Sequence, residues 1–327
     1  MRVNFWGVRG SVATSLTYLD IEEKLRRALT YATPADILTE ESVDQFLNGL
    51  PFSVRGTYGG STTCLELETD NGSTIILDAG TGLRRLGNNL LSQGKFKGDD
   101  HAAFLMTHSH WDHLQGLLFF VPFYMPGNKF SFYSAFPDIE DRVRYQNSLR
   151  HFPIAFDDMA STKDFNTPVI EEGEFTEIFD VQVTCKAVRH PGGCYSYKIK
   201  NSDGKTFIFC TDTEFNMETM ENIDEYLEYF EGADLLVFDT QYTFEESLNK
   251  IDWGHSSAAI ATDIAMRCNV KKLVLFHHDP SYNDEKLDAI SLQAINYRDQ
   301  ARKLQGISAK EIPLEIKAAY EGLSLEV

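Results

Sequence analysis

Four side chains that can bind metal ions fall within six consecutive residues of the chain: His108, His110, Asp112 and His113. Imidazole and carboxylate groups together suit zinc, manganese or iron. The segment directly follows the apolar run 102–107, which predicts a buried strand. Alternate side chains of a strand share a face, so His108 and His110 should point the same way. Four polar groups beside a core strand are costly unless something binds them, so this segment predicts a metal site.

Three more metal-competent side chains each come after a predicted strand: His190, Asp212 and His277. A single histidine or aspartate in such a place is more often a cap or a turn residue. Repetition at several strand ends, on one side of a sheet, favours a shared functional role instead. Residues 191–193, Pro-Gly-Gly, let the backbone turn sharply next to His190. The seven side chains together predict a site for two divalent metal ions.

The strands expected to position these side chains are short and mostly apolar, and lie at 2–6, 63–69, 73–78, 102–107, 177–188, 195–200, 205–210, 234–239 and 272–276. Helical periodicity is clearest at 17–30, 113–121, 217–230, 256–268 and 284–304. The first half of the chain is rich in strands, and the second half alternates strand and helix. This order predicts an α+β fold in which two mixed sheets pack face to face with helices outside.

Residues 12–56 differ from their surroundings because they have helical periodicity and no clear strand. We expect a helical insertion there, either a surface hairpin or a lid over the substrate. No low-complexity linker divides the chain, so residues 1–327 are expected to form a single domain.

Composition limits the partners. Hydrophobic residues make up 43% and charged residues 24%, as in globular proteins. The sequence contains no run of about eighteen apolar residues, so no membrane-spanning helix is expected. Five cysteines, none spaced as CxxC, suggest free thiols in a reducing cytoplasm. The formal charge of −19 disfavours long nucleic acid, whereas a small anionic phosphodiester can bind if metal ions supply positive charge. A homodimer is compatible with this composition.

The segment HSHWDH resembles the HxHxDH motif of the metallo-β-lactamase superfamily, which folds as an αββα sandwich with a binuclear metal site. The later candidates follow in the family's order. The segments GVRGS (7–11), YGG (58–60) and FHHDP (276–280) resemble its phosphodiesterase-like branch. That branch is similar to the carbon–phosphorus lyase accessory phosphodiesterase and, more distantly, to the tRNA 3′-processing endonuclease. About 45 residues separate GVRGS from YGG here, whereas the branch joins them closely.

The resemblance implies a division of the ligands. One metal would be held by His108, His110 and His190, the other by Asp112, His113 and His277, with Asp212 bridging them. Zinc is favoured, and manganese and iron are alternatives. Asp78, in LDAGTG, would orient a ligand histidine; the alternative is a plain turn carboxylate.

Two histidines remain to be assigned. Strand polarity and the resemblance favour His277 over the adjacent His278 as the ligand, which leaves His278 to support the site or contact substrate. His255, in WGHSS, resembles the histidine that contacts the scissile phosphate in the phosphodiesterase branch; a helix-capping loop residue is the alternative.

The resemblance implies a binuclear hydrolase that cleaves a small linear or cyclic nucleotide, or a phosphoribosyl-type phosphodiester, through a hydroxide bridging the metals. Asp112 would orient the nucleophile, and His255 would neutralise the phosphate or assist the leaving oxygen. The alternatives are an RNA 3′-processing endonuclease, a thioester or lactam hydrolase, and a noncatalytic metal- or nucleotide-binding sensor.

Overall fold

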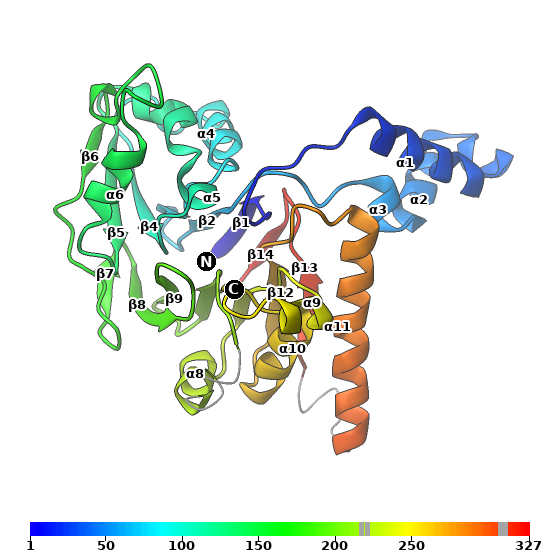
Figure 1. Ribbon diagram of the computed structural model, residues 1–327. Helices are drawn as coiled ribbons and strands as arrows, with labels where there is room; N and C mark the ends of the chain where they lie inside the picture. The colour runs from blue at the N-terminus through cyan, green and yellow to red at the C-terminus, as the bar shows by residue number, and fades with distance from the viewer. Residues whose placement is uncertain (216–218, 220–222, 307–312) are drawn as a thin grey trace.

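The computed structural model describes residues 1–215, 219, 223–306 and 313–327. Within this part of the chain the strands form two seven-stranded mixed sheets. The first sheet has the order β14-β1-β2-β3-β4-β5-β6, and the second β13-β12-β11-β10-β9-β8-β7. β14 pairs with β1, which brings the two chain ends close together (Figure 1).

The strands of the first sheet are β1 (Arg2–Gly7), β2 (Cys64–Glu68), β3 (Thr74–Leu77), β4 (His101–Met106), β5 (Lys129–Ser134), β6 (Thr162–Asp164) and β14 (Ser324–Glu326). Those of the second are β7 (Thr176–Ile178), β8 (Val181–Val188), β9 (Cys194–Lys200), β10 (Thr206–Cys210), β11 (Leu235–Asp239), β12 (Lys272–Phe276) and β13 (Glu315–Ala318). The larger helices are α1 (Tyr18–Tyr31), α2 (Glu40–Gly49), α4 (Leu83–Ser92), α6 (Ile139–Gln146), α8 (Ile223–Phe230), α10 (Ala258–Arg267) and α11 (Asp284–Gln305).

Each sheet buries both of its faces, which explains the nearly continuous apolar runs of the central strands. In β10, Phe207 and Phe209 belong to the core between the sheets, whereas Ile208 and Cys210 pack in the outer cluster that includes α10. Leu65, Leu67 and other side chains of the first sheet fill the same central core from the opposite side. This packing holds the strand ends rigidly.

The register places the chemistry at one edge of the sandwich. β3 runs parallel to β4, and β10, β11 and β12 run parallel to one another. The carboxyl ends of parallel neighbours meet at the same edge of a sheet. Within each sheet the loops that follow these strands therefore open at one edge, and side chains from the two edges come together.

Most of the expected elements are present, with ends shifted by a few residues. The expected strand 177–188 is instead a hairpin, β7 and β8, that turns at Phe179, whose φ is +54°. Strands β5, β6, β13 and β14 were not expected. The helix expected at 217–230 is seen at Ile223–Phe230, and most of its first turns lie outside the described residues.

The helix expected at 113–121 is wrong. A four-residue helix, α5 (Trp111–Leu114), is followed by the short 3₁₀ turns η2 (Leu117–Phe119) and η3 (Val121–Tyr124). Gly116 lies against the carbonyl of Gly80, with no room for a Cβ, and its N–H bonds to Ala79. This close approach diverts the chain before a regular helix can continue.

The segment between β1 and β2 forms α1, η1 (Pro34–Ile37), α2 and α3 (Phe52–Arg55), which project beside the start of α11 (Figure 1). Lys24 anchors α1 by donating hydrogen bonds to Gly56 O (2.8 Å) and to Asp284 Oδ2 (2.6 Å) at the start of α11. The outer face of α1 is apolar and solvent-exposed, with Tyr18 77% and Leu29 74% exposed. That residues 1–327 form one domain stays a prediction.

All five cysteines are buried and unpaired. Among the described residues, no helix is both long enough and apolar enough to cross a bilayer.

Candidate metal centre

The seven candidate ligands gather in two groups where the two sheets meet. His108, His110 and His190 offer ligand atoms within 4.8 Å of one another, and so do Asp112, His113, Asp212 and His277. These are the groups that the resemblance implies. That the side chains bind metal ions stays a prediction, which the geometry around each atom supports.

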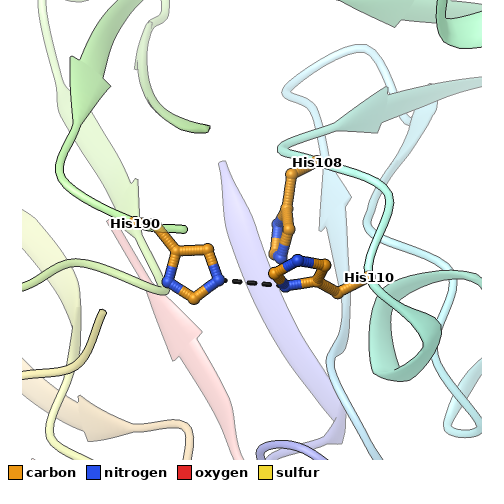
Figure 2. Close-up of side chains that lie close together, drawn as sticks. All are labelled: His108, His110 and His190. Atoms are coloured by element: carbon orange, nitrogen blue, oxygen red, sulfur yellow. Dashed lines mark hydrogen bonds between the residues drawn. The ribbon is translucent and has the colours of Figure 1, made fainter. Parts of the chain in front are cut away.

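The first group consists of three imidazoles from three segments. Figure 2 shows His108 and His110, from the loop after β4, facing His190, from the loop after β8. His110 Nδ1 lies 3.0 Å from His190 Nε2. Two nitrogens bound tetrahedrally to one zinc ion at about 2.0–2.1 Å would be roughly 3.3 Å apart. The spacing therefore fits a shared cation.

Asp212 lies between the two groups. Its Oδ1 is 3.6 Å from His190 Nε2 and 3.3 Å from His277 Nε2. Its Oδ2 is 3.2 Å from His113 Nε2. A carboxylate with one oxygen close to imidazoles of both groups, and the other facing the second group, is placed to bridge two cations.

The outer nitrogens of the histidines are held by hydrogen bonds that leave the inner nitrogens free. His113 donates Nδ1–H to Asp78 Oδ2 (2.8 Å), and His190 donates Nδ1–H to Gly254 O (3.0 Å). A carboxylate or a carbonyl can only accept, so the neutral form of each ring carries its lone pair on Nε2. Among the described residues, Nε2 of His108, His113 and His277 is buried without a hydrogen-bond partner. Buried nitrogens without a hydrogen-bond partner are rare, and bound cations would give all three nitrogens a partner.

The charges also fit a cation. Burial lowers the pKa of His108 well below its usual value and lowers the pKa of His277, so both rings are in the neutral form that binds metals. Burial opposes charge on Asp212, but the surrounding histidines, His277 first, hold its pKa well below its usual range. For His113 burial acts downward, yet Asp212 and two further carboxylates raise its pKa well above normal. The buried carboxylates therefore give the site a negative charge that would favour the binding of a cation.

Three of the strand-end aspartates and histidines have left-handed backbone. The φ angles are +57° for Asp78 after β3, +50° for Asp212 after β10 and +62° for His277 after β12. Left-handed conformations are uncommon outside glycine and cluster at functional sites, where other interactions enforce them. At all three positions, the left-handed backbone therefore turns the chain sharply at the end of a strand.

Two glycines of the sequence motifs make room for ligands. A Cβ on Gly10, in GVRGS, would lie 2.5 Å from His277 Nε2. A Cβ on Gly254, whose φ is +86°, would collide with His190 Nδ1. Each motif thus lets backbone approach a ligand ring closely, which sequence reasoning did not identify.

Asp78 lies beneath the site and is completely buried. Its Oδ1 accepts from Thr107 N (2.8 Å), and its Oδ2 accepts from Thr107 Oγ1 (2.7 Å) and from His113 Nδ1. These contacts support the prediction that Asp78 orients His113 and the start of the HSHWDH segment, over the alternative of a plain turn carboxylate.

His255 faces the same site from the loop after α9 (Phe244–Asn249). Its Nδ1 donates to Asp239 Oδ2 (2.8 Å), and its ring stacks on His277 with centroids 5.2 Å apart. Burial acts to lower the pKa of His255, but Asp239 reverses this and raises it above the usual value. His190, Asp212 and His255 also come within 4.8 Å of one another, so metal binding by His255 is an alternative to substrate binding.

His278 points away from the cluster. Its Nε2 donates to Ala319 O (2.9 Å), and its ring contacts Tyr58 edge-on. Burial lowers the pKa of His278 to about 3, so the ring is neutral. Its backbone pairs with Val8 and Gly10 and so secures the GVRGS loop. The geometry gives His278 a supporting role and does not place it against substrate.

We expect His277→Ala to lose bound metal and activity together, because it removes an unpartnered nitrogen from the cluster. His278→Ala should keep most of the metal but lower the free energy of unfolding by about 1–3 kcal/mol, because Ala319 O loses its buried partner. Elemental analysis and thermal melting of the two variants check this. The reverse pattern would assign the ligand to His278.

A cavity of about 420 Å³ opens over the cluster and is lined by Ser11, Ser109, His110, Trp111, Asp112, His190, Asp212, His255 and His277. Ser11 N–H donates to Asp112 Oδ2 (2.7 Å) and fixes that carboxylate. Residues 12–56, all of which the structure describes, contribute nothing to this lining, which favours a surface hairpin over a lid.

Sequence reasoning missed Asp239 and Trp111. Asp239 ends the apolar run of β11 as Asp212 follows that of β10, so the same strand-end signal would have found it. Trp111 lies between two predicted ligands in HSHWDH, and an aromatic residue in that position is itself a signal.

Parts of the sequence are similar to known proteins. Residues 73–278 match the profile of the beta-lactamase superfamily domain. A ribonuclease Z from Prochlorococcus marinus (strain MIT 9515) is 24% identical over 299 residues, which cover 73% of this chain and 88% of that protein. Another, from strain NATL1A, is 33% identical over 79 residues, so the match spans 24% of this chain and only 23% of that relative's length.

Solved structures show the same fold. The metallo-beta-lactamase fold protein YhfI from Bacillus subtilis gives a TM-score of 0.62 at 14% identity, covering 100% of this chain and 98% of that one. A diphosphatase from the PhnP family and the short form of human tRNase Z each give 0.57 at 15% identity, covering 100% of this chain and 97% and 99% of theirs. The predicted αββα sandwich and family resemblance are confirmed.

Proposed function

The chain belongs to the beta-lactamase superfamily, and we propose that this hydrolase cleaves small phosphodiesters at a centre of two divalent metal ions. The observation that carries the proposal is the arrangement around Asp212. Its Oδ1 faces imidazoles of both groups, its Oδ2 faces His113, and His255 lines the same cavity. His108, His110 and His190 would hold one ion and Asp112, His113 and His277 the other, with Asp212 shared. Zinc suits this nitrogen and oxygen donor set, as do manganese and iron.

Two bound ions would activate a water molecule and offset the negative charge that develops on the phosphoryl oxygens. The side chains supply position and protons. Asp112, whose Oδ2 is fixed by Ser11 N–H, can orient the attacking water through its other oxygen. His255 has Nδ1 anchored on Asp239, which leaves Nε2 for the substrate. From there it can neutralise the phosphate or donate a proton to the departing oxygen.

The cavity and the charge support a small substrate. At about 420 Å³ the cavity is at the lower end of the range for small-molecule sites. The net charge of −19 repels an extended polyanion, whereas the charge of the cations acts locally on a single phosphodiester.

A second candidate is an RNA 3′-processing endonuclease, favoured by the similarity to ribonuclease Z over 73% of the chain. The same ligand groups and the same His255 would serve that reaction. The strong negative charge counts against it, because RNA-binding surfaces are normally basic.

We expect protein prepared with added metal to contain two ions per chain and to hydrolyse linear and cyclic mononucleotide phosphodiesters, with loss of turnover on chelation. A panel that also contains a precursor tRNA, a thioester and a β-lactam checks this. Efficient cleavage of only the precursor tRNA would establish the endonuclease instead. Turnover of only the thioester or the lactam would move the activity to another branch, and no turnover of any substrate by the two-metal protein would indicate a sensor.

A further inference from the structure

Trp111 is exposed at the mouth of the catalytic cavity. Among the described residues, the other eight that line this cavity are serines, histidines and aspartates, so Trp111 supplies the large apolar surface of this lining. The indole is 70% exposed, although a tryptophan side chain normally buries most of its area. Trp111 belongs to none of the hydrophobic clusters formed by the described residues.

The position of Trp111 in the sequence places it next to ligands of both groups. It lies between His110 and Asp112, which belong to the two different ligand groups. Consecutive Cα atoms are about 3.8 Å apart, so the Cα of Trp111 lies at about that distance from the Cα of one ligand in each group. Because Trp111 lines the same cavity as these ligands, a planar group joined to the phosphate through a sugar can contact the indole while the phosphate remains over the cluster.

A permanent protein partner does not explain this exposed surface, because covering Trp111 would close the mouth of the cavity that the substrate must enter. A ligand that comes and goes with the reaction fits better. Flat aromatic ligands stack on tryptophan faces, and every nucleobase has such a face.

We propose that Trp111 is a stacking platform for the nucleobase of a mononucleotide substrate. The inference rests on the proposed function and narrows it, because a phosphoribosyl-type diester without a base would leave the indole uncovered. Trp111 is then a specificity residue. It binds the part of the substrate that does not react, whereas Asp112 and His255 act at the phosphate.

The test compares two product-like probes on the metal-loaded protein by calorimetry: adenosine 5′-monophosphate and ribose 5-phosphate. They share the phosphate and the sugar and differ in the base. We expect the nucleotide to bind more tightly by about 5- to 150-fold, the range expected for stacking of one base. Trp111→Ala should abolish this ratio and leave the affinity for ribose 5-phosphate unchanged, whereas Trp111→Phe should keep a large part of it.

Tyr145→Ala is the matched control, because Tyr145 is 84% exposed on α6 and does not line the cavity. It should leave the ratio unchanged. An unchanged ratio in Trp111→Ala, with ribose 5-phosphate still bound, would overturn the stacking role and leave the phosphodiesterase proposal standing. If the wild type binds neither probe and turns over no phosphodiester, the proposed function itself fails. Thermal melting confirms that each variant is folded.

Discussion

Replacing His255 with alanine should lower kcat by about 10²–10⁴-fold on phosphodiesters with poor, alkoxide leaving groups, because the loss of one general acid has an effect of that size. The protein should keep both metal ions. The structure holds His255 Nδ1 on Asp239 Oδ2 at 2.8 Å and leaves Nε2 for the cavity. A nitrophenyl diester, whose leaving oxygen hardly needs a proton, should lose much less. Steady-state kinetics on the two substrate classes, with metal analysis, check this.

Asp239→Asn is the companion variant. The amide has nearly the same shape but removes the negative charge that faces the imidazole, so Asp239 acts as a positioning residue through His255. We expect a smaller loss than in His255→Ala, with the same dependence on the leaving group. Equal losses on both substrate classes would show that His255 only binds phosphate. A fall in metal content of His255→Ala would make it a ligand, as its closeness to His190 and Asp212 allows.

Much of the site could be predicted because its ligands follow strands that are recognisable in the sequence. Asp212 and His277 each come after an apolar run that is buried on both faces of the sheet. Such runs are easy to recognise, and a polar residue directly after one is conspicuous. The spacing within HSHWDH then added the four ligands of a single loop.

The parts that were missed depend on contacts between distant segments. Gly116 ends the expected helix 113–121 because it lies against Gly80, more than thirty residues earlier in the sequence. The support of His255 by Asp239 depends on a loop folding back onto β11. Strand β14 is three residues long, and its pairing with β1 joins the two ends of the chain. No local pattern encodes such contacts.

Asp212→Asn should lose high affinity for both metal ions, since its carboxylate faces histidines of both groups. Asparagine tolerates left-handed backbone, so the φ of +50° at this position does not prevent folding. An amide lacks the charge that balances two cations, and activity should fall with the metal content. In contrast, His110→Ala should lose one ion preferentially, because it removes a terminal ligand from one group.

Thermal melting with and without chelator gives a second readout for Asp212→Asn. A ligand at 100 times its Kd stabilises a protein by about 2.7 kcal/mol, so the wild type should melt lower after chelation. The variant should show little change. Its metal-free form should melt lower than that of the wild type, because the histidines around Asp212 stabilise its charged carboxylate, as its low pKa indicates. Asp263→Asn, on α10 and outside the cluster, should behave as wild type. Two ions retained in Asp212→Asn, with a normal response to chelator, would show that Asp212 does not join the two groups.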